Sequence, residues 1–205
     1  MTNQPRVDLL FPYPVVVVPP PDNFDGGELE ELCYAERRLN GAGSARSNNG
    51  GWQSARDIFA RPDLRKLTGA ISERVSTGLA SLPLAHSAYE INSCWINISP
   101  PGAFHWDHIH TGCAISGVFY VKADGRDAGR LWFGADQGRG EELDCYAENY
   151  KNSAFTWPRY GYDPLPGSAI LFPATLTHRV DPNLSASDRI SVSFNIRSQH
   201  GTTTT

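Results

Sequence analysis

The stretch DRISVSFNI, residues 188–196, alternates polar and apolar side chains along its length. Because successive side chains of a β-strand point to opposite faces, this alternation predicts a strand with one apolar face and one polar face. One face would carry the polar residues Arg189, Ser191 and Ser193. The other would carry the apolar residues Ile190, Val192 and Phe194. The apolar face is expected in a core, and the polar face lies either toward water or toward a ligand.

Similar segments recur from Tyr89 onward. Short runs rich in Ile, Val, Phe, Tyr and Trp are separated by clusters of Gly, Pro, Asn and Asp, which are strand and turn signals. No helical pattern lies between these runs, which argues against parallel βαβ units and favours a double-sheet jelly roll, a mainly β fold. We expect strands at about 89–98, 113–123, 130–133, 154–157, 168–172, 176–180 and 189–196.

The N-terminal third predicts supporting helices. We expect a first strand within 9–21, a helix within 21–40, a loop over 41–51, and a helical region from Trp52 to about residue 82 that Pro62 splits. The polar segment 134–153 is predicted to be an insertion between strands, and the tail GTTTT to be disordered. We expect one domain over 1–205, with helical support at about 21–85 and the jelly-roll core at about 89–197.

Composition and charge exclude several functions. A formal net charge of −4 and a pI near 5.8 give no basic field for nucleic-acid phosphates. The most apolar run, residues 9–21, is broken by Pro12 and Pro14 and is shorter than the roughly 20 residues of a spanning helix, so no membrane association is expected. The four cysteines form no CxxC pair and no secretory signal precedes them, which indicates reduced thiols in a cytoplasmic protein.

The stretch GAFHWDHIHTG, residues 102–112, concentrates three histidines and an aspartate, which is a typical donor set for a metal ion. Residues two apart on a strand share a face, so His105 with Asp107 and His108 with His110 are competing ligand pairs. The remaining strand-associated histidine is His178, which we expect to be the third ligand. Three protein ligands on an octahedral ion leave open positions for a chelating cosubstrate and dioxygen.

Arg189 and Tyr120 suggest an anion site in the same fold. An inward-facing arginine is costly unless it meets an anion, and a dicarboxylate would supply one, because the planar guanidinium binds carboxylates bidentately. The alternative is that the face carrying Arg189 is the solvated side of a sheet. Tyr120, in SGVFYVK, is either a polar contact or an ordinary core aromatic.

Taken in order, several segments resemble the Fe(II)- and 2-oxoglutarate-dependent oxygenases, in particular a family related to the prolyl hydroxylases. These segments are LFPYPV, SNNGGWQS, WINISPPGAFHWDHIHTGCAISGVFYV, PLPGSAILFPATLTHRVDP and RISVSFN. The resemblance implies a double-stranded β-helix, a variant of the jelly roll, with helices from the N-terminal third. It implies Fe(II) and 2-oxoglutarate as cofactors, and hydroxylation of a substrate C–H bond with release of succinate and CO2.

The resemblance also implies site residues. HIHTGCAISGVFY is similar to the family's HxHP followed by SGVYY, which implies His108 and His110 as the near ligands and His178 as the distal one, with Thr111 in place of the usual proline. The wider superfamily uses HxD, which His105 and Asp107 also match. For the far carboxylate of 2-oxoglutarate, the resemblance implies a set of polar contacts, namely Arg189, Ser191, Tyr120 and Asn97.

Two other functions remain open. A cupin-like metalloenzyme that does not use 2-oxoglutarate is suggested by the GxxxxxHxH spacing from Gly102, although the usual cupin glutamate is absent. A jelly-roll binding protein without catalysis is the second. We expect the substrate of an oxygenase to be a small molecule or a protein side chain. The valine-rich first strand would either pair across a homodimer or lie at an edge inside the sheet.

Overall fold

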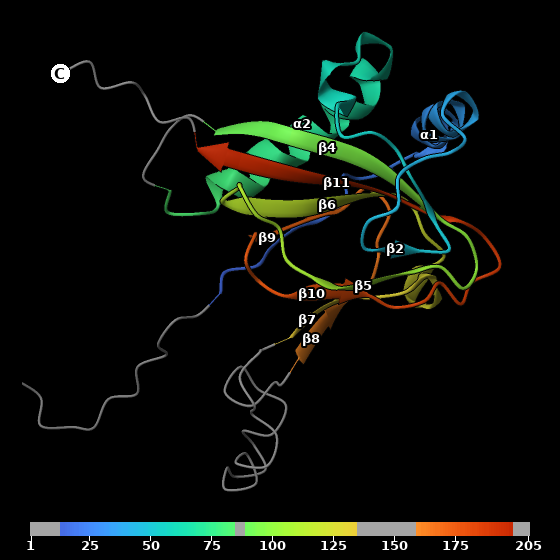
Figure 1. Cartoon of the computed structure of the whole chain (residues 1–205). Coiled ribbons are helices and arrows are strands. Elements are labelled where there is room, and N and C mark those ends of the chain that lie inside the picture. The colour runs from blue at the N-terminus through green and yellow to red at the C-terminus, as the bar shows by residue number, and fades with distance from the viewer. Residues whose placement is uncertain (1–12, 85–88, 135–158, 199–205) are drawn as a thin grey trace, which may run out of the picture.

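The computed structural model describes residues 13–84, 89–134 and 159–198, which form two antiparallel sheets and two α-helices (Figure 1). The larger sheet has the order β1-β9-β6-β11-β4-β3, and the smaller has the order β2-β5-β10-β7-β8. This is the jelly-roll arrangement predicted from the sequence. The larger sheet comprises β1 (Val16–Val18), β9 (Ala169–Pro173), β6 (Ile115–Lys122), β11 (Arg189–Ser198), β4 (Tyr89–Ser99) and β3 (Trp52–Gln53). The smaller comprises β2 (Asn48–Asn49), β5 (Phe104–His108), β10 (His178–Val180), β7 (Leu131–Gly134) and β8 (Arg159–Tyr162).

The helices cover the outer face of the larger sheet, and the smaller sheet packs on the opposite side (Figure 1). They are α1 (Gly27–Leu39) and α2 (Arg65–Ala80), and three 3-10 turns accompany them, at Ile58–Ala60, Pro62–Leu64 and Gly125–Ala128. None of the helices that the structure describes is both long and apolar enough to cross a membrane.

Strand β11 shows why the core splits into two layers. Its apolar side chains Ile190, Val192 and Phe194 pack toward the helices, as the alternation predicted. Its polar side chains Arg189 and Ser191 line the space between the two sheets. A second apolar cluster closes this inner space, made of Val118, Tyr120, Leu131, Phe133, Ile170, Phe172 and Leu176. The functional residues therefore lie between the sheets, on the side away from the helices.

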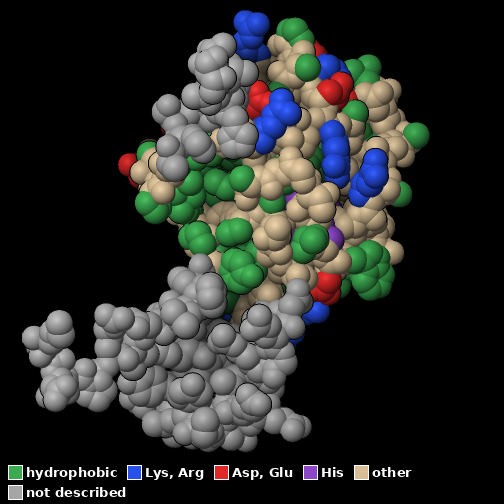
Figure 2. Space-filling model, turned by 60° about the vertical axis from the view of Figure 1, so that its left-hand side comes forward, with side chains coloured by type: hydrophobic (Ala, Val, Ile, Leu, Met, Phe, Trp, Pro, Cys, Tyr) green, Lys and Arg blue, Asp and Glu red, His purple; other side chains and the backbone are tan. Residues whose placement is uncertain are grey.

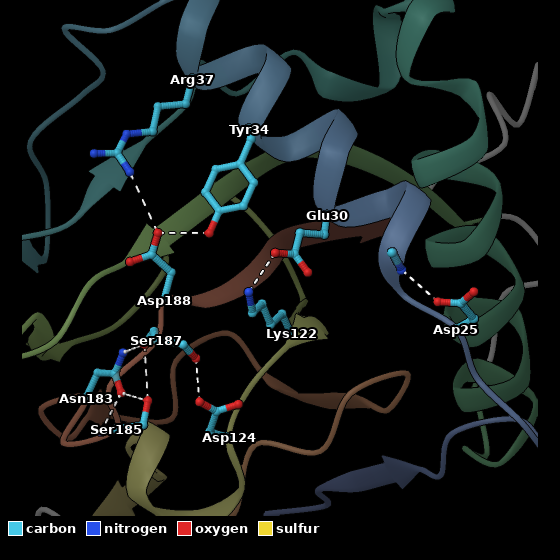
Figure 3. Close-up of polar contacts among 11 residues, drawn as sticks. Asp25, Glu30, Tyr34, Arg37, Lys122, Asp124, Asn183, Ser185, Ser187 and Asp188 are labelled. Carbon is cyan, nitrogen blue, oxygen red and sulfur yellow. Dashed lines mark hydrogen bonds and ion pairs between the residues drawn. The ribbon is translucent and has the colours of Figure 1, made fainter.

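Helix α1 fixes the start of β11 (Figure 3). The Tyr34 hydroxyl donates to the Asp188 carboxylate at 3.0 Å, and the Arg37 guanidinium lies 3.9 Å from the same carboxylate. One turn earlier in the helix, Glu30 pairs with Lys122 at 2.6 Å, at the end of β6. Because Asp188 directly precedes Arg189, these contacts hold the backbone that carries the buried arginine.

Three expectations about local structure were wrong. Trp52 does not begin a helix but forms β3, because its backbone pairs with Ile98 of β4 and its indole Nε1 donates to the Asn40 carbonyl at 2.9 Å. Tertiary pairing here overrides a weak helical preference. Strands β5 and β8 were not expected, and β2 lies inside the expected loop over 41–51. A helix does begin after Pro62, whose fixed φ suits the first turn.

Several predicted segments lie outside the described residues. These are the expected strand at 154–157, nearly all of the insertion at 134–153, the GTTTT tail and the start of the first strand, residues 9–12. The described part of that first strand, β1, pairs antiparallel with β9 at the edge of the larger sheet.

Candidate metal centre and anion site

Three histidines meet between the sheets. The ligand atoms offered by His108, His110 and His178 all lie within 4.8 Å of one another. The Nε2 atoms of His110 and His178 are 3.3 Å apart, and the ring centroids of His108 and His178 are 4.2 Å apart. His178 is only 4% exposed, while His108 and His110 are half-buried. Three imidazoles converging in this way form a set of nitrogen donors suited to a divalent transition metal.

Strand pairing produces this meeting. His178 lies directly opposite His108 in the antiparallel pair of β10 and β5, and Val180 lies opposite His105. Two steps along β10 therefore match three steps along β5, which is a bulge. The bulge turns both His105 and His108 to the cavity, where strict alternation would have separated them. His110 follows the end of β5 and is fixed by its backbone N–H, which donates to the Ala174 carbonyl at 2.8 Å.

Backbone carbonyls set the orientation of two of the rings. The Nδ1 of His108 lies 2.7 Å from the Trp106 carbonyl oxygen, and the Nδ1 of His178 lies 2.8 Å from the Leu176 carbonyl oxygen. A carbonyl can only accept, so each Nδ1 carries the proton and donates it. Each Nε2 is then left with a free lone pair, which is the form of histidine that binds metals.

Burial keeps the triad neutral. Desolvation lowers the pKa of His178 to about 3, with the nearby His108 as the next largest cause, and it lowers the pKa of His110 to about 4. Desolvation also lowers the pKa of His108, although its hydrogen bond to Trp106 and the Asp107 carboxylate act in the opposite direction. A neutral imidazole can bind a metal ion near pH 7 without first losing a proton.

The alternative pair does not assemble. Asp107 is exposed and is not among the described residues that line the cavity. His105 does line it, and its Nδ1 lies 3.4 Å from the Ser47 hydroxyl, which is also 3.4 Å from Nε2 of His108. Burial, followed by the charge of Arg189, lowers the pKa of His105 to about 3. His105 is therefore a neutral neighbour of the triad.

Arg189 is a buried cation with an unused donor. It is 2% exposed, and its Nη1 donates to the Ala128 carbonyl, with the Gly129 and Asp181 carbonyls each at 3.4 Å. Its Nη2 is buried without any hydrogen-bond partner. No carboxylate pairs with Arg189 among the residues that the structure describes. Burial lowers the pKa of the guanidinium, whereas the charges of Tyr120 and Asp181 raise it. An anion is the group that would satisfy Nη2.

The other predicted anion-binding residues lie beside Arg189 in the cavity wall. Ser191 of β11 is directly opposite Asn97 of β4 on one side and Tyr120 of β6 on the other, so the three form a row across three strands. The Asn97 Nδ2 donates to the Ser193 hydroxyl at 3.0 Å, and the Asn97 Oδ1 is buried without a partner. Burial raises the pKa of the Tyr120 hydroxyl to about 12, so it stays protonated and can donate.

Sequence reasoning missed Trp95 and Asn195. The Trp95 ring stacks on His110 at 5.7 Å between centroids, and the Asn195 side chain hydrogen-bonds to His110. Trp95 shares its strand face with Asn97, so the alternation of β4 was a usable signal. Ser47 comes from an irregular polar loop and carries no such signal.

Comparisons with known proteins give relatives by fold. The chain is similar to the crystal structure of a Pseudomonas putida prolyl-4-hydroxylase, with a TM-score of 0.60 and 17% identity over 92% of this chain and 94% of that one. A Trichoplax adhaerens prolyl hydroxylase, solved with a hypoxia inducible factor peptide fragment, has a TM-score of 0.60 and 13% identity, over 90% of this chain and 83% of that one. HygX from Streptomyces hygroscopicus, solved with nickel and 2-oxoglutarate bound, has a TM-score of 0.57 and 13% identity, over 90% of this chain and 83% of that one.

The described sheets and helices thus share the double-stranded β-helix of these oxygenases. A comparison with curated proteins found no match. The family model described as "Putative 2OG-Fe(II) oxygenase" matches residues 93–195, which is half of the chain and includes the histidine triad and Arg189. On this evidence the chain belongs to the family of 2-oxoglutarate/Fe(II) oxygenases.

Proposed function

We propose that this protein is an Fe(II)- and 2-oxoglutarate-dependent dioxygenase that hydroxylates a substrate C–H bond and releases succinate and CO2. One observation carries the proposal. A histidine triad able to hold a metal and a buried arginine with a free donor line the same cavity between two sheets. Either feature alone occurs in proteins of many kinds, but together they match the two groups that this chemistry needs.

The triad fits the metal. His108, His110 and His178 would hold Fe(II) through their Nε2 atoms, since the Nδ1 atoms of His108 and His178 are already used by backbone carbonyls. Imidazole is a suitable ligand for iron, and three protein ligands leave coordination positions for a cosubstrate and dioxygen. Without a carboxylate ligand, the centre would keep the full charge of the ion, which favours anionic partners.

The opposite wall fits 2-oxoglutarate. The free Nη2 of Arg189 would bind the 5-carboxylate, and the hydroxyls of Ser191 and Tyr120 would donate to its oxygens. Rotating the Asn97 amide would let Oδ1 accept from the Ser193 hydroxyl and turn Nδ2 to the cavity as a donor. The larger sheet would thus hold the cosubstrate's far end, while His108 and His178 of the smaller sheet would hold the metal.

The residues of the chain contribute geometry and exclusion of water. Bound together, Fe(II) and 2-oxoglutarate would supply the oxidising chemistry for hydroxylation of a C–H bond by dioxygen. The Ala128, Gly129 and Asp181 carbonyls hold the Arg189 fork in place before any ligand arrives. The apolar side chains of Leu131 and Phe172 line the cavity and limit access of bulk water.

The test is an anaerobic titration of metal-free protein with Fe(II) and then with 2-oxoglutarate, following the visible charge-transfer band of a chelated 2-oxo acid. The band should appear in the parent, disappear in His108→Ala and His178→Ala, and persist in the matched control His105→Ala. Metal binding without the band would refute 2-oxoglutarate use and favour a cupin-like metalloenzyme. Absence of metal binding would favour a non-catalytic jelly roll.

A further inference from the structure

Two arginines, Arg56 and Arg46, lie near residues that contact the histidine triad. The Arg56 guanidinium lies over the Trp95 ring, 4.5 Å from its centroid. Trp95 stacks on His110, and His110 stacks on His178 with an interplanar angle of 7° and 5.1 Å between centroids. The four side chains form a column that begins at an exposed cation and ends at the buried member of the triad. Arg56 is thus two ring layers away from His178.

Arg46 stands next to another residue that contacts the triad. It is exposed and directly precedes Ser47, whose hydroxyl lies 3.4 Å from the Nε2 of His108. The Arg46 charge acts on Arg56 and, after burial, is the next cause that lowers its pKa, so the two guanidinium groups repel each other. Figure 2 shows Lys and Arg side chains (blue) on the same face as recessed His side chains (purple).

Neither arginine has an acidic partner in the described part of the chain. Other arginines are paired, such as Arg61 with Asp63 at 2.6 Å and Arg130 with Asp163 at 2.7 Å. Two unpaired cations held near each other carry a cost that a bound anion would remove.

The two cationic sites are in different parts of the fold. Arg189 lines the cavity between the sheets, whereas Arg56 is not among the described residues that line it and lies over the Trp95 ring. Arg189 is buried and Arg56 is exposed. An anion at Arg56 would therefore be a different group from one held at Arg189.

We propose that Arg56, supported by Arg46, binds an anionic group of the primary substrate, a carboxylate or a phosphate, next to the Trp95 indole that lines the cavity. That the anion belongs to a substrate rests on the proposed function, whereas the anion site itself does not. Stacking on Trp95 holds the guanidinium plane in place, and a planar fork fixed in this way can bind a carboxylate or phosphate bidentately. The anchored substrate would present a C–H bond close to its charged group.

The first test reads Arg56 directly. In 15N-labelled, zinc-loaded protein, with 2-oxoglutarate added to fill the Arg189 site, the arginine Nε–Hε signals are followed during titration with acetate, inorganic phosphate or neutral acetamide. The Arg56 signal, assigned with Arg56→Gln, should shift to saturation with one or both anions and not with acetamide. The anion with the lower dissociation constant identifies the substrate group.

Arg159 is the matched control. Its guanidinium also lies over an indole, 4.9 Å from the Trp132 centroid, on β8 at the edge of the smaller sheet. Its signal should not saturate, and Arg159→Gln should leave the Arg56 titration unchanged, while Arg46→Gln should weaken it by up to about fivefold. Equal, non-saturating shifts at Arg56 and Arg159 would overturn the proposal, because they would mean general salt effects only.

The titration separates this inference from the proposed function. Repeated without 2-oxoglutarate, it still reports on Arg56, so saturation there together with failure to bind 2-oxoglutarate would reject only the dioxygenase assignment. Conversely, a normal 2-oxoglutarate charge-transfer band with no saturable Arg56 shift would reject only the anion site. In a screen for succinate formation, Arg56→Gln should raise the KM of an anionic substrate at least tenfold and leave that of the cosubstrate unchanged.

Discussion

Replacing Arg189 with methionine is the sharpest test of the anion site between the sheets. Methionine has a similar length and is apolar, so it fills most of the volume and removes the charge. In the part of the chain that the structure describes, the Nη2 of Arg189 has no hydrogen-bond partner, so a 5-carboxylate would be its first acceptor. Removing one member of a buried, hydrogen-bonded charge pair costs about 2–5 kcal/mol. The dissociation constant of 2-oxoglutarate should therefore rise by about 30-fold to several thousand-fold.

The same substitution also affects stability. The three carbonyls around Nη1 lose their donor, and each buried acceptor left unpaired costs about 1–3 kcal/mol. Arg189→Lys is the informative companion, because an ammonium keeps the charge but cannot donate to the carbonyls and to a carboxylate with one planar fork. It should recover part of the stability and less of the affinity.

The assay is anaerobic calorimetry of 2-oxoglutarate binding to metal-loaded protein, with circular dichroism to confirm folding and a separate metal titration. Metal affinity should change little, since Arg189 is not one of the three converging ligands. Parent-like 2-oxoglutarate affinity in folded Arg189→Met would refute the reasoning, because the cosubstrate would then bind elsewhere.

Three further perturbations have defined outcomes. Gly129→Ala should destabilise the fold by about 1–3 kcal/mol and weaken 2-oxoglutarate binding. Gly129 has φ +90°, and an added Cβ would lie 2.3 Å from the Asp181 carbonyl oxygen and 2.5 Å from Nη1 of Arg189. Urea unfolding like that of the parent would contradict this prediction. Metal-free protein should lose stability as the pH falls below 6.5, since His178, with its pKa lowered to about 3, stays neutral when folded but takes up a proton on unfolding. His178 accounts for about 2 kcal/mol of the loss at pH 5, and His105 and His110, whose pKa values burial also lowers, add to it, so urea unfolding at pH 7 and pH 5 should show a smaller loss in His178→Asn. Asp107→Asn should leave the metal dissociation constant unchanged in a competition titration, because Asp107 is exposed, and a tenfold loss of affinity would place it in the coordination shell.

The regular parts of the fold could be predicted from the sequence. The alternation of strand β11 correctly put Arg189 and Ser191 on the opposite face from Ile190, although the sequence left open whether the polar face met water or a ligand. Asn97 of β4 lies opposite Ser191 in a regular pairing, whereas the pairing of β11 with β6 shifts register between Ile190 and Ser191, next to the pair of Ser191 and Tyr120. A regular pairing extends the pattern of one strand to its neighbour, because each residue has one facing partner.

Irregular backbone could not be predicted in this way. The bulge between β5 and β10 turns His105 and His108 to the same cavity, although they are three residues apart. A local pattern cannot show a bulge, since it depends on how two distant strands pair. The same holds for the carbonyls that surround Nη1 of Arg189, which come from Ala128 and Gly129, 61 and 60 residues before it, and from Asp181, eight residues before it. Trp52 was misassigned for a related reason, because its pairing with β4 is non-local.

The stack of Trp95 on His110 gives the protein an intrinsic optical reporter. An indole stacked on an imidazole, here with ring centroids 5.7 Å apart, has an emission that responds to the electronic state of that ring. Of the tryptophans that the structure describes, Trp95 alone stacks on a histidine of the triad, and it is almost fully buried, so its fluorescence is shielded from bulk quenchers. Occupation of the triad can therefore be followed without a label, by comparing the parent with Trp95→Phe, at protein concentrations too low for absorbance.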